Sequence, residues 1–410
     1  MRKRVIQRPR SEVATASRHL AGACAGILQD HLHRLRRVCD HHNRVLHLDE
    51  LLVAHLLGFF DPTVRSLRTL DARSVASETA SEALDHLRLA RSTISDAMND
   101  LSAEALLPLM QELLARLPDN CSHPDLADLL MLKKRIIAID GSYFRVPCDV
   151  MWALAHRRSN QKVGRQVRLD LHLDVVRFVP VKAQVDGKDR GSESAAFIGT
   201  LESGLVYLAD RNFIDFEFLR AVLNAGSDFV ARLKKAGSGP NVTVCQTLAL
   251  TQQEIDGGVL SDQIVMLPGS QGAPGFAEHK FRLVTVWDPV RREEVRLLTT
   301  LLDVPVSLIG KLYRHRWSIE LFFRWLKCVA KIKHLFNESS NGITMQFYIV
   351  IIATLLMYLY TGARPSVYTF MLLSSAAAGD LVLEKVPEVL ERLARERELE
   401  RLRRAKKKTV

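Results

Sequence analysis

One stretch of the chain places a single acid among cations at helical spacing. Residues 306–332 contain six Lys or Arg side chains and one carboxylate, Glu320. Five residues follow one another at steps of three or four, so they would form one stripe along a helix: Tyr313, Arg316, Glu320, Arg324 and Lys327. A carboxylate lined up with cations and a tyrosine would suit a metal ion beside a phosphate backbone. The alternative is a solvated basic face with incidental pairing between residues four apart.

Two aspartates come at the ends of apolar runs far upstream. Asp140 closes KRIIAID and Asp210 closes GLVYLAD. Acids at strand ends are held rigidly and can converge on two divalent ions about 3.5–4 Å apart. Each also has a plain structural explanation, a turn at Asp140 and a surface ion pair at Asp210. Four nearby acids are rivals, of which alternation places the first two on one face: Asp170, Asp174, Asp186 and Asp189.

The pattern around these acids predicts an α/β (α+β) core. Apolar alternation predicts strands at 167–176 and 179–185, after the first run. The run 204–210 is followed by a helical pattern and by a fifth strand at 228–235. This order is similar to that of the ribonuclease H-like fold, a mixed sheet covered by helices. The first and fourth strands are neighbours there, so the two aspartates would meet.

Residues 236–302 interrupt that alternation with a β-rich insertion. Its clearest signal is a hairpin in which FRLVTVW pairs with EVRLLTTL across Asp288-Pro289. One long helix is predicted to follow over 306–332, with Ser307 as its N-cap. As this helix packs over the sheet, it would bring Glu320 to the two aspartates.

The N-terminal 130 residues read as helical throughout. RSTISDAM resembles the turn and second helix of a helix-turn-helix, whose first residues can reach base edges. Arg91, Ser92 and Thr93, with Arg88 and Ser95, are therefore expected to contact DNA. A Ser or Thr that only caps a helix looks the same, so this alternative stays open. The His and Cys residues between positions 31 and 47 fit no zinc spacing and predict a solvated helix face.

The composition excludes a disordered chain and favours an acidic partner. The chain has 410 residues, 47% hydrophobic residues and a formal net charge of +11. The charge favours nucleic acid first and an anionic membrane second. The six scattered cysteines and the absence of an apolar region behind the basic start predict a reducing, cytoplasmic location. The apolar segment 343–360 is predicted to be a buried core helix, so no membrane partner is expected.

Three sequence blocks, in order, resemble the DDE transposases of bacterial insertion sequences, in the family named for insertion sequence four. IAIDGSYFRV resembles the first-aspartate block and LADRNFIDFEFL the second. The pattern Tyr-x2-Arg-x3-Glu-x6-Lys over 313–327 resembles the YREK signature of that family. The resemblance covers about residues 130–360, including the β-rich insertion before the last block.

This resemblance implies a reaction and a metal. Asp140, Asp210 and Glu320 would be catalytic and would hold two Mg²⁺ ions, for which Mn²⁺ can substitute. The implied reaction is cleavage at insertion-sequence ends and transfer of the 3′-OH into target DNA. The implied partners are double-stranded DNA with terminal inverted repeats, target DNA, and a second copy of the chain in a homodimeric synaptic complex.

The resemblance also implies DNA-binding residues. Tyr313, Arg316 and Lys327 would bind phosphates near the transposon end. Arg324 is not part of the motif, but it lies on the same stripe and is therefore expected to add a phosphate contact. Trp287 would stack on a flipped base in a hairpin step, unless it only packs in its own hairpin.

Trp317 and Trp325, in contrast, are expected to pack. The expected division of the chain is a helical DNA-binding region (1–130), the first part of a ribonuclease H-like core (131–235), the β-rich insertion (236–302), the last part of the core (303–365) and a charged helical tail (366–410).

Two other functions remain as alternatives. One is a ribonuclease H-like, metal-dependent DNA nuclease without strand transfer. The other is a catalytically silent, transposase-derived DNA-binding protein. The tyrosine–arginine–lysine stripe and the long insertion argue against the first, and the presence of all three acids argues against the second.

Overall fold

The structure is a computed structural model. It describes residues 20–38, 45–61, 63–76, 89–118, 124–157, 163–187, 193–234, 240–269, 275–276, 279–329, 335–362, 364–378 and 380–408. The chain forms two compact units, and each draws on separate parts of the sequence. The first comprises Met1–Leu117, Val146–Val150 and Trp325–Val410, and the second comprises Pro118–Arg145 and Met151–Arg324.

The first unit is helical in its described part, as predicted for the N-terminal residues. Its elements are α1 (Leu20–Arg37), α2 (Leu48–Phe60), α3 (Leu67–Ala76), α5 (Arg91–Asp100), η2 (Ala103–Leu106), α6 (Leu107–Arg116), α12 (Ser340–Thr361), α13 (Val367–Ala378), η5 (Leu383–Lys385) and α14 (Val386–Lys408).

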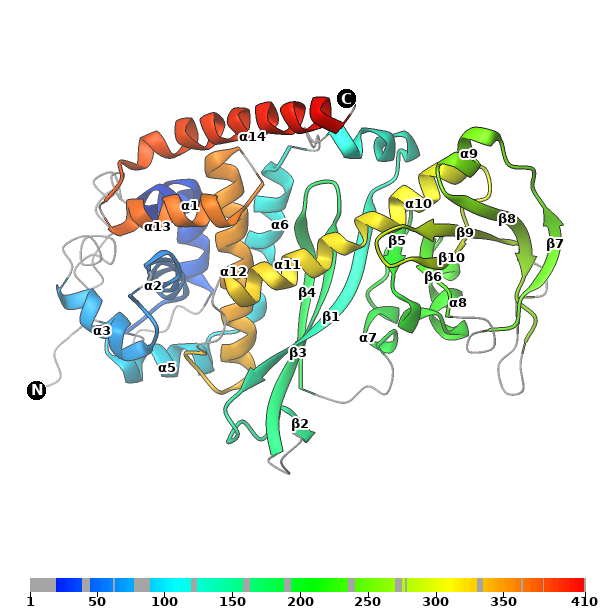
Figure 1. Ribbon diagram of the computed structural model, residues 1–410. Helices are drawn as coiled ribbons and strands as arrows, with labels where there is room; N and C mark the ends of the chain where they lie inside the picture. Colours follow the sequence, from blue (N-terminus) through cyan, green and yellow to red (C-terminus); the bar gives the residue numbers. More distant parts are fainter. Residues whose placement is uncertain are drawn as a thin grey trace, which may run out of the picture. The chain divides into compact units, whose positions relative to one another are not determined.

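Helix α12 is the core of this unit. It is long and apolar enough to cross a membrane, but most of it is buried by the helices around it. It packs against α2, α5 and α6 (Figure 1). The Ser339 hydroxyl caps its first turn by accepting from Gly342 N–H, and Gly362 ends it in the left-handed conformation at φ 64°. This is the core helix predicted for 343–360.

The second unit is built on one mixed sheet. Its strands are β1 (Ile136–Val146), β2 (Leu154–Arg157), β3 (Val163–Asp174), β4 (Val179–Asp186), β5 (Val206–Ala209), β6 (Asp228–Arg232), β7 (Thr243–Thr247), β8 (Val259–Met266), β9 (Phe281–Asp288) and β10 (Glu293–Thr299). Its helices are η3 (Pro124–Leu132), α7 (Ala195–Ile198), η4 (Arg211–Phe213), α8 (Phe216–Asn224), α9 (Gln252–Asp256), α10 (Val306–His315) and α11 (Trp317–Cys328), and the last 4 residues of α11 belong to the first unit.

The strand order confirms the ribonuclease H-like fold. The neighbours run β2-β3-β1-β5-β6-β10-β9-β8-β7, and β4 also pairs with β3. Strand β5 is parallel to both β1 and β6, whereas β4 is antiparallel to β3. The core order β4-β3-β1-β5-β6 therefore places the first and fourth predicted strands side by side.

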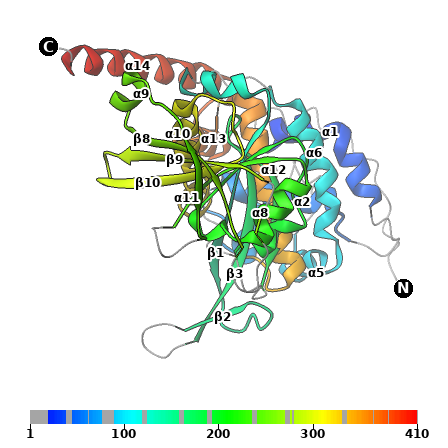
Figure 2. The same cartoon turned by 90° about the vertical axis from the view of Figure 1, so that its right-hand side faces the viewer.

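The β-rich segment continues this sheet. Strand β10 pairs antiparallel with β6, and β9, β8 and β7 follow outward. The predicted hairpin is confirmed, because β9 and β10 lie side by side (Figure 2). Asp288 stands opposite Glu293 at its turn. The segment thus widens the sheet edge beyond β6.

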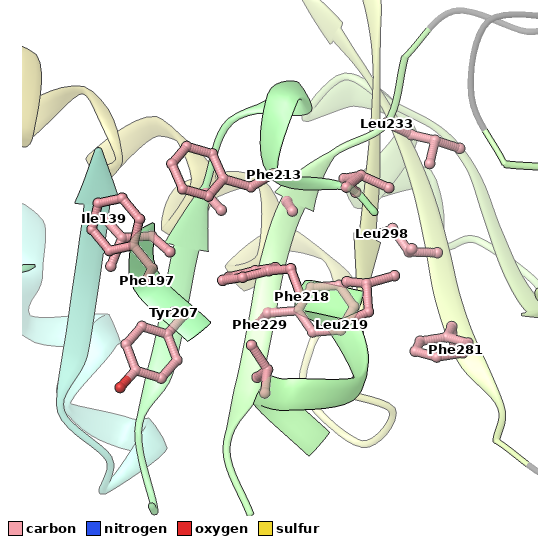
Figure 3. Packing of buried hydrophobic residues seen from close by; sticks show 14 of the residues in the cluster. Ile139, Phe197, Tyr207, Phe213, Phe218, Leu219, Phe229, Leu233, Phe281 and Leu298 are labelled. Atoms are coloured by element: carbon pink, nitrogen blue, oxygen red, sulfur yellow. The ribbon is translucent and has the colours of Figure 1, made fainter. Parts of the chain in front are cut away.

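Helices cover both faces of the sheet in this unit. On one face, Phe213, Phe218 and Leu219 pack against Tyr207 and Phe229 (Figure 3). On the other, α10 packs against β6, β9 and β10. Because both faces are covered, the strand starts read as continuous apolar runs, as in residues 136–139 of β1, which are all buried.

Two predictions about these elements were wrong. The helix expected over 306–332 is two helices, α10 and α11, with Pro305 rather than Ser307 at the N-cap. Between them, Arg316 N–H bonds to the carbonyl of Tyr313, three residues back, which tightens the turn. Strand β1 also does not end at Asp140 but continues to Val146, although its pairing with β5 ends at Ala138.

Candidate active site

The two aspartates lie where β1 and β5 separate. Asp140 stands two residues beyond Ala138, which is the last residue of β1 paired with β5. Asp210 directly follows β5 and precedes the single turn η4. Parallel pairing places these two positions at the same edge of the strand pair, because both strands run in one direction. The side chains of both residues are partly buried.

The junction of α10 and α11 brings the stripe residues to these acids. Arg316 Nη2 donates to Glu320 Oε1 over 2.5 Å, and Arg316 Nη1 lies 4.0 Å from Asp140 Oδ2. The Tyr313 hydroxyl donates to Asp210 Oδ1 over 3.4 Å, and its ring lies 5.7 Å from the Arg316 guanidinium carbon. The predicted alignment of Tyr313, Arg316 and Glu320 therefore exists in the folded chain.

Arg316 is the charge on which the acids converge. The residue is only 7% exposed. Burial by itself would lower its pKa, but the neighbouring Tyr313, Glu320 and Asp210 raise the pKa above its ordinary value. Burial also raises the pKa of the Tyr313 hydroxyl to about 12, so this hydroxyl is a hydrogen-bond donor at neutral pH.

Asp140 has an unusual proton affinity for an aspartate. Burial raises its pKa to about 7, and the carboxylates of Glu193 and Glu320 add to the increase. The charge of Arg316 and the 2.8 Å hydrogen bond from Gly141 N–H act in the opposite direction. A buried carboxylate surrounded by other carboxylates would be relieved by any cation that binds there.

The donor chemistry of the site fits a divalent cation such as Mg²⁺. Asp140, Asp210 and Glu320 supply the hard carboxylate oxygens that Mg²⁺ and Mn²⁺ prefer. Within the described residues, however, no group of three His, Cys, Asp or Glu side chains is close enough to hold one ion together. The acids instead gather around Arg316, whose guanidinium carries the compensating positive charge in this structure.

A side chain at Gly141 would displace an ion pair that lies against its backbone. A Cβ at this position would lie 2.4 Å from both Arg168 Nε and Asp170 Oδ1. Arg168 and Asp170 are joined by a 2.6 Å hydrogen bond on β3. Asp170, the first of the rival acids, is therefore the ion-pair partner of Arg168 next to the site.

The other rival acids lie elsewhere or cannot be placed. Asp174 is buried and accepts from Arg177 at the β3–β4 turn and from Arg135. Asp186 ends β4, and Asp189 lies outside the described residues.

The other predicted DNA-binding residues near these elements lie further along α11 and on β9. Arg324 is exposed on α11, and Lys327 follows on the part of that helix assigned to the first unit. Trp287 is the last residue but one of β9 and is 45% exposed.

One of the two packing predictions for tryptophans was wrong. Trp325 is 7% exposed and faces Phe59, as expected for a packing residue. Trp317 is 40% exposed instead, and the Arg291 guanidinium carbon lies 5.8 Å from its ring centre. It begins α11, so it lies at the helix end rather than on the buried face of the helix.

The possible DNA-reading residues of the first unit begin α5. The N-cap is Ala90, so neither Ser92 nor Thr93 is in the capping position. Arg91 and Ser92 are exposed and Thr93 is partly buried. Arg88 lies outside the described residues.

Sequence reasoning missed two residues that border the site. Arg168 lies against Gly141, and the carboxylate of Glu193 acts on Asp140. Glu193 gave no periodic signal, because it stands in a Ser- and Glu-containing loop before the short α7. Only the fold brings that loop to Asp140 and Gly141 of β1.

Comparison with known proteins identifies the family. The family model described as "Transposase DDE domain" matches residues 131–356, more than half of the chain. The chain is 29% identical over 160 residues to "Putative transposase y4zB" of Sinorhizobium fredii, covering 38% of this chain and 43% of the relative. It is 24% identical over 156 residues to "Probable transposase for insertion sequence element IS5377" of Geobacillus stearothermophilus, covering 38% and 39%.

A third relative and one solved structure add smaller similarities. The chain is 35% identical over 80 residues to "Putative transposase for insertion sequence element IS4SA" of Synechocystis sp., covering 20% of this chain and 22% of the relative. The chain thus spans less than half the length of these curated relatives. A piggyBac transposase synaptic complex with hairpin DNA aligns with 90% of this chain and 76% of its own, at 10% identity and a TM-score of 0.40, too low to support an argument. Because the family model matches more than half of the chain, the chain belongs to the family of proteins with a transposase DDE domain.

Proposed function

We propose that this chain catalyses Mg²⁺-dependent cleavage at insertion-sequence ends and transfers the freed 3′-OH into target DNA. The observation that carries the proposal is the convergence on Arg316. One buried cation bonds to Glu320, lies 4.0 Å from Asp140 and has its pKa raised by Asp210. Asp140 and Glu320 are 180 residues apart in the chain, yet both of them and Asp210 interact with Arg316.

Asp140, Asp210 and Glu320 would hold two divalent ions. When bound, these ions supply an activated water and stabilise the leaving 3′ oxygen. The Gly141 N–H fixes one oxygen of Asp140 and leaves the other toward Arg316. Tyr313 stays protonated and can donate to Asp210 or to a phosphate oxygen. Arg316 can exchange a carboxylate for a phosphate, since guanidinium binds both.

The remaining partners follow from the same proposal. The substrate is double-stranded DNA with terminal inverted repeats, joined to target DNA in the cytoplasm at the nucleoid. Two copies of the chain would form the synaptic complex. Arg324 and Lys327 continue the stripe along α11 as further phosphate contacts, and Trp287 offers an exposed indole for a flipped base. Arg91, Ser92 and Thr93 would read end DNA from the start of α5.

A strand-transfer assay tests the proposal. Labelled DNA carrying the inverted repeat that flanks the coding frame is incubated with purified chain, a target plasmid and Mg²⁺. We expect cleaved ends and joined products, both lost on chelation of the metal. Glu320→Gln should reduce cleavage at least about a thousandfold while end binding persists, because it removes a ligand charge without changing side-chain size.

The possible outcomes separate the candidate functions. Cleavage without joined product would make the chain a nuclease that lacks strand transfer. End binding with no cleavage would make it a silent DNA-binding protein. Cleavage by Glu320→Gln at the wild-type rate would show that the acids are assigned wrongly.

A further inference from the structure

Glu193 is held in place from two sides. Its main-chain carbonyl accepts from Arg168 Nη2 over 3.3 Å, and its Oε2 accepts from Asn212 Nδ2 over 3.2 Å. The next residue, Ser194, is fully buried and donates its hydroxyl to Asp215, the N-cap of α8. The loop before α7 is therefore attached to β3, to η4 and to the start of α8.

These attachments connect Glu193 to residues that adjoin both aspartates. Arg168 is the residue that crosses Gly141, directly after Asp140. Asn212 lies in η4, two residues after Asp210. A carboxylate fixed at both of these points belongs to the same sheet edge as the acids predicted from the sequence.

We propose that Glu193 is a fourth carboxylate of the active site and provides an oxygen ligand to the divalent cation held by Asp140. This inference rests on the proposed function, because it concerns the metal of that reaction. In the part of the chain that the structure describes, Asn212 is the one residue that donates to the Glu193 carboxylate, through Oε2. Oε1 is the oxygen that the proposal assigns to the cation.

The electrostatics agree with this placement. After burial, the carboxylate of Glu193 is the strongest influence that raises the pKa of Asp140, ahead of Glu320. Two carboxylates that repel one another in a partly buried site are typical of groups that share a cation.

Metal binding by the DNA-free, full-length chain tests the inference without an activity measurement. Mn²⁺ is titrated into wild type and Glu193→Gln, followed by calorimetry and by the EPR signal of free Mn²⁺. The amide oxygen of Gln can still accept from Asn212, so only the charge is removed. We expect the affinity for Mn²⁺ to fall at least about tenfold. Glu217→Gln, at an exposed position of α8, removes the same charge and should bind as wild type does.

Two further variants make the result decisive. Asp140→Asn should lose the site; if it binds Mn²⁺ as wild type does, or if wild type binds none, the metal site of the proposed function is wrong. If Asp140→Asn loses binding but Glu193→Gln retains wild-type affinity, only the role of Glu193 is overturned, and it is a structural anchor. Should Glu193→Gln fail to fold, Asn212→Ala decides, because freeing the carboxylate should weaken Mn²⁺ binding and unchanged affinity would contradict the inference.

Discussion

Two arginines of the second unit are buried to the same degree but are bonded very differently. Arg282 of β9 grips Asp262 of β8 through Nε and Nη2 at 2.8 and 2.6 Å, and its Nη1 bonds to the carbonyls of Leu302 and Val304. Arg316 makes one 2.5 Å bond to Glu320 and lies 4.0 Å from Asp140. Among the described residues, nothing accepts from its buried Nε.

The two ion pairs differ in how many of their arginine donors are already bonded. Every nitrogen of Arg282 has an acceptor, and both members of its pair are almost fully buried. Such a pair fixes the strands and has nothing left to offer a ligand. Arg316 retains unused donor capacity next to carboxylates that are themselves partly exposed. An arginine with unbonded donors can change partners, and its planar guanidinium can bind a phosphate through two hydrogen bonds.

Removing Asp262 should produce the largest effect on stability. Asp262→Asn leaves the Arg282 charge buried without its counter-charge, so we expect the free energy of unfolding to fall by about 3–5 kcal/mol. Glu320→Gln should cost less than about 1 kcal/mol, because Glu320 is 30% exposed. Urea unfolding of both variants measures the contrast, with Asp256→Asn as an exposed control. Equal losses for Asp262→Asn and Glu320→Gln would contradict the distinction between the two pairs.

The pH dependence of stability should identify Asp140 as a member of the site. Its pKa is about 7 in the folded chain and ordinary in the unfolded chain. Folding therefore favours the protonated form, so its contribution is full below the unfolded pKa and is lost as pH rises to 7. Asp140→Asn cannot ionise. Its metal-free stability should match wild type near pH 4 and exceed it above pH 7, by at most about 4 kcal/mol.

The structural pair provides the control for this measurement. Asp262→Asn should be less stable than wild type near neutral pH, the opposite sign to Asp140→Asn. Thermal unfolding in chelator across pH 4–8 would test both. A wild-type excess of stability over Asp140→Asn at pH 8 would mean that Asp140 is ionised without cost, and the burial argument would fail.

Much of the fold was readable from local pattern. Residues 136–139 and 206–209 are apolar runs that both faces of the sheet bury, and each predicts a strand without long-range information. The 281–301 hairpin was equally clear, because its turn residues and alternation agree. The sequence could not predict that the hairpin extends the sheet formed by β1, β5 and β6. The pairing of β6 with β10 joins residues at least 65 positions apart. The break at Arg316 was also hidden, because no Pro or Gly marks it.

The sequence pointed to candidate site residues only where they lie on a helix or directly follow an apolar run. Tyr313, Arg316 and Glu320 follow helical spacing, and the spacing survives the break. Glu193 stands in a loop, and its position depends on contacts with β3 and η4 that no local pattern encodes. The partner of Arg282 was also not predictable from a local pattern. Asp262 lies on the neighbouring strand and is not directly opposite Arg282, which pairs with Ile264.

The smallest predicted effect concerns the unused donors of Arg316. If this side chain exchanges its carboxylates for a phosphate, Arg316→Ala should weaken end binding by about tenfold. The slope of log affinity against log salt should also become shallower by about 1. The reason is that losing one phosphate contact means that about one fewer counterion is released on binding. Arg314→Ala, an exposed arginine two residues away and off the stripe, removes the same charge without the contact.

Fluorescence anisotropy with end DNA at several salt concentrations measures both quantities. Arg314→Ala reports the general effect of one positive charge, and the excess loss in Arg316→Ala reports the contact itself. Equal slopes in the two variants would mean that Arg316 stays bonded to Glu320 when DNA binds. Arg316 would then be a second structural pair like Arg282, and its open Nε would have no role in gripping the substrate.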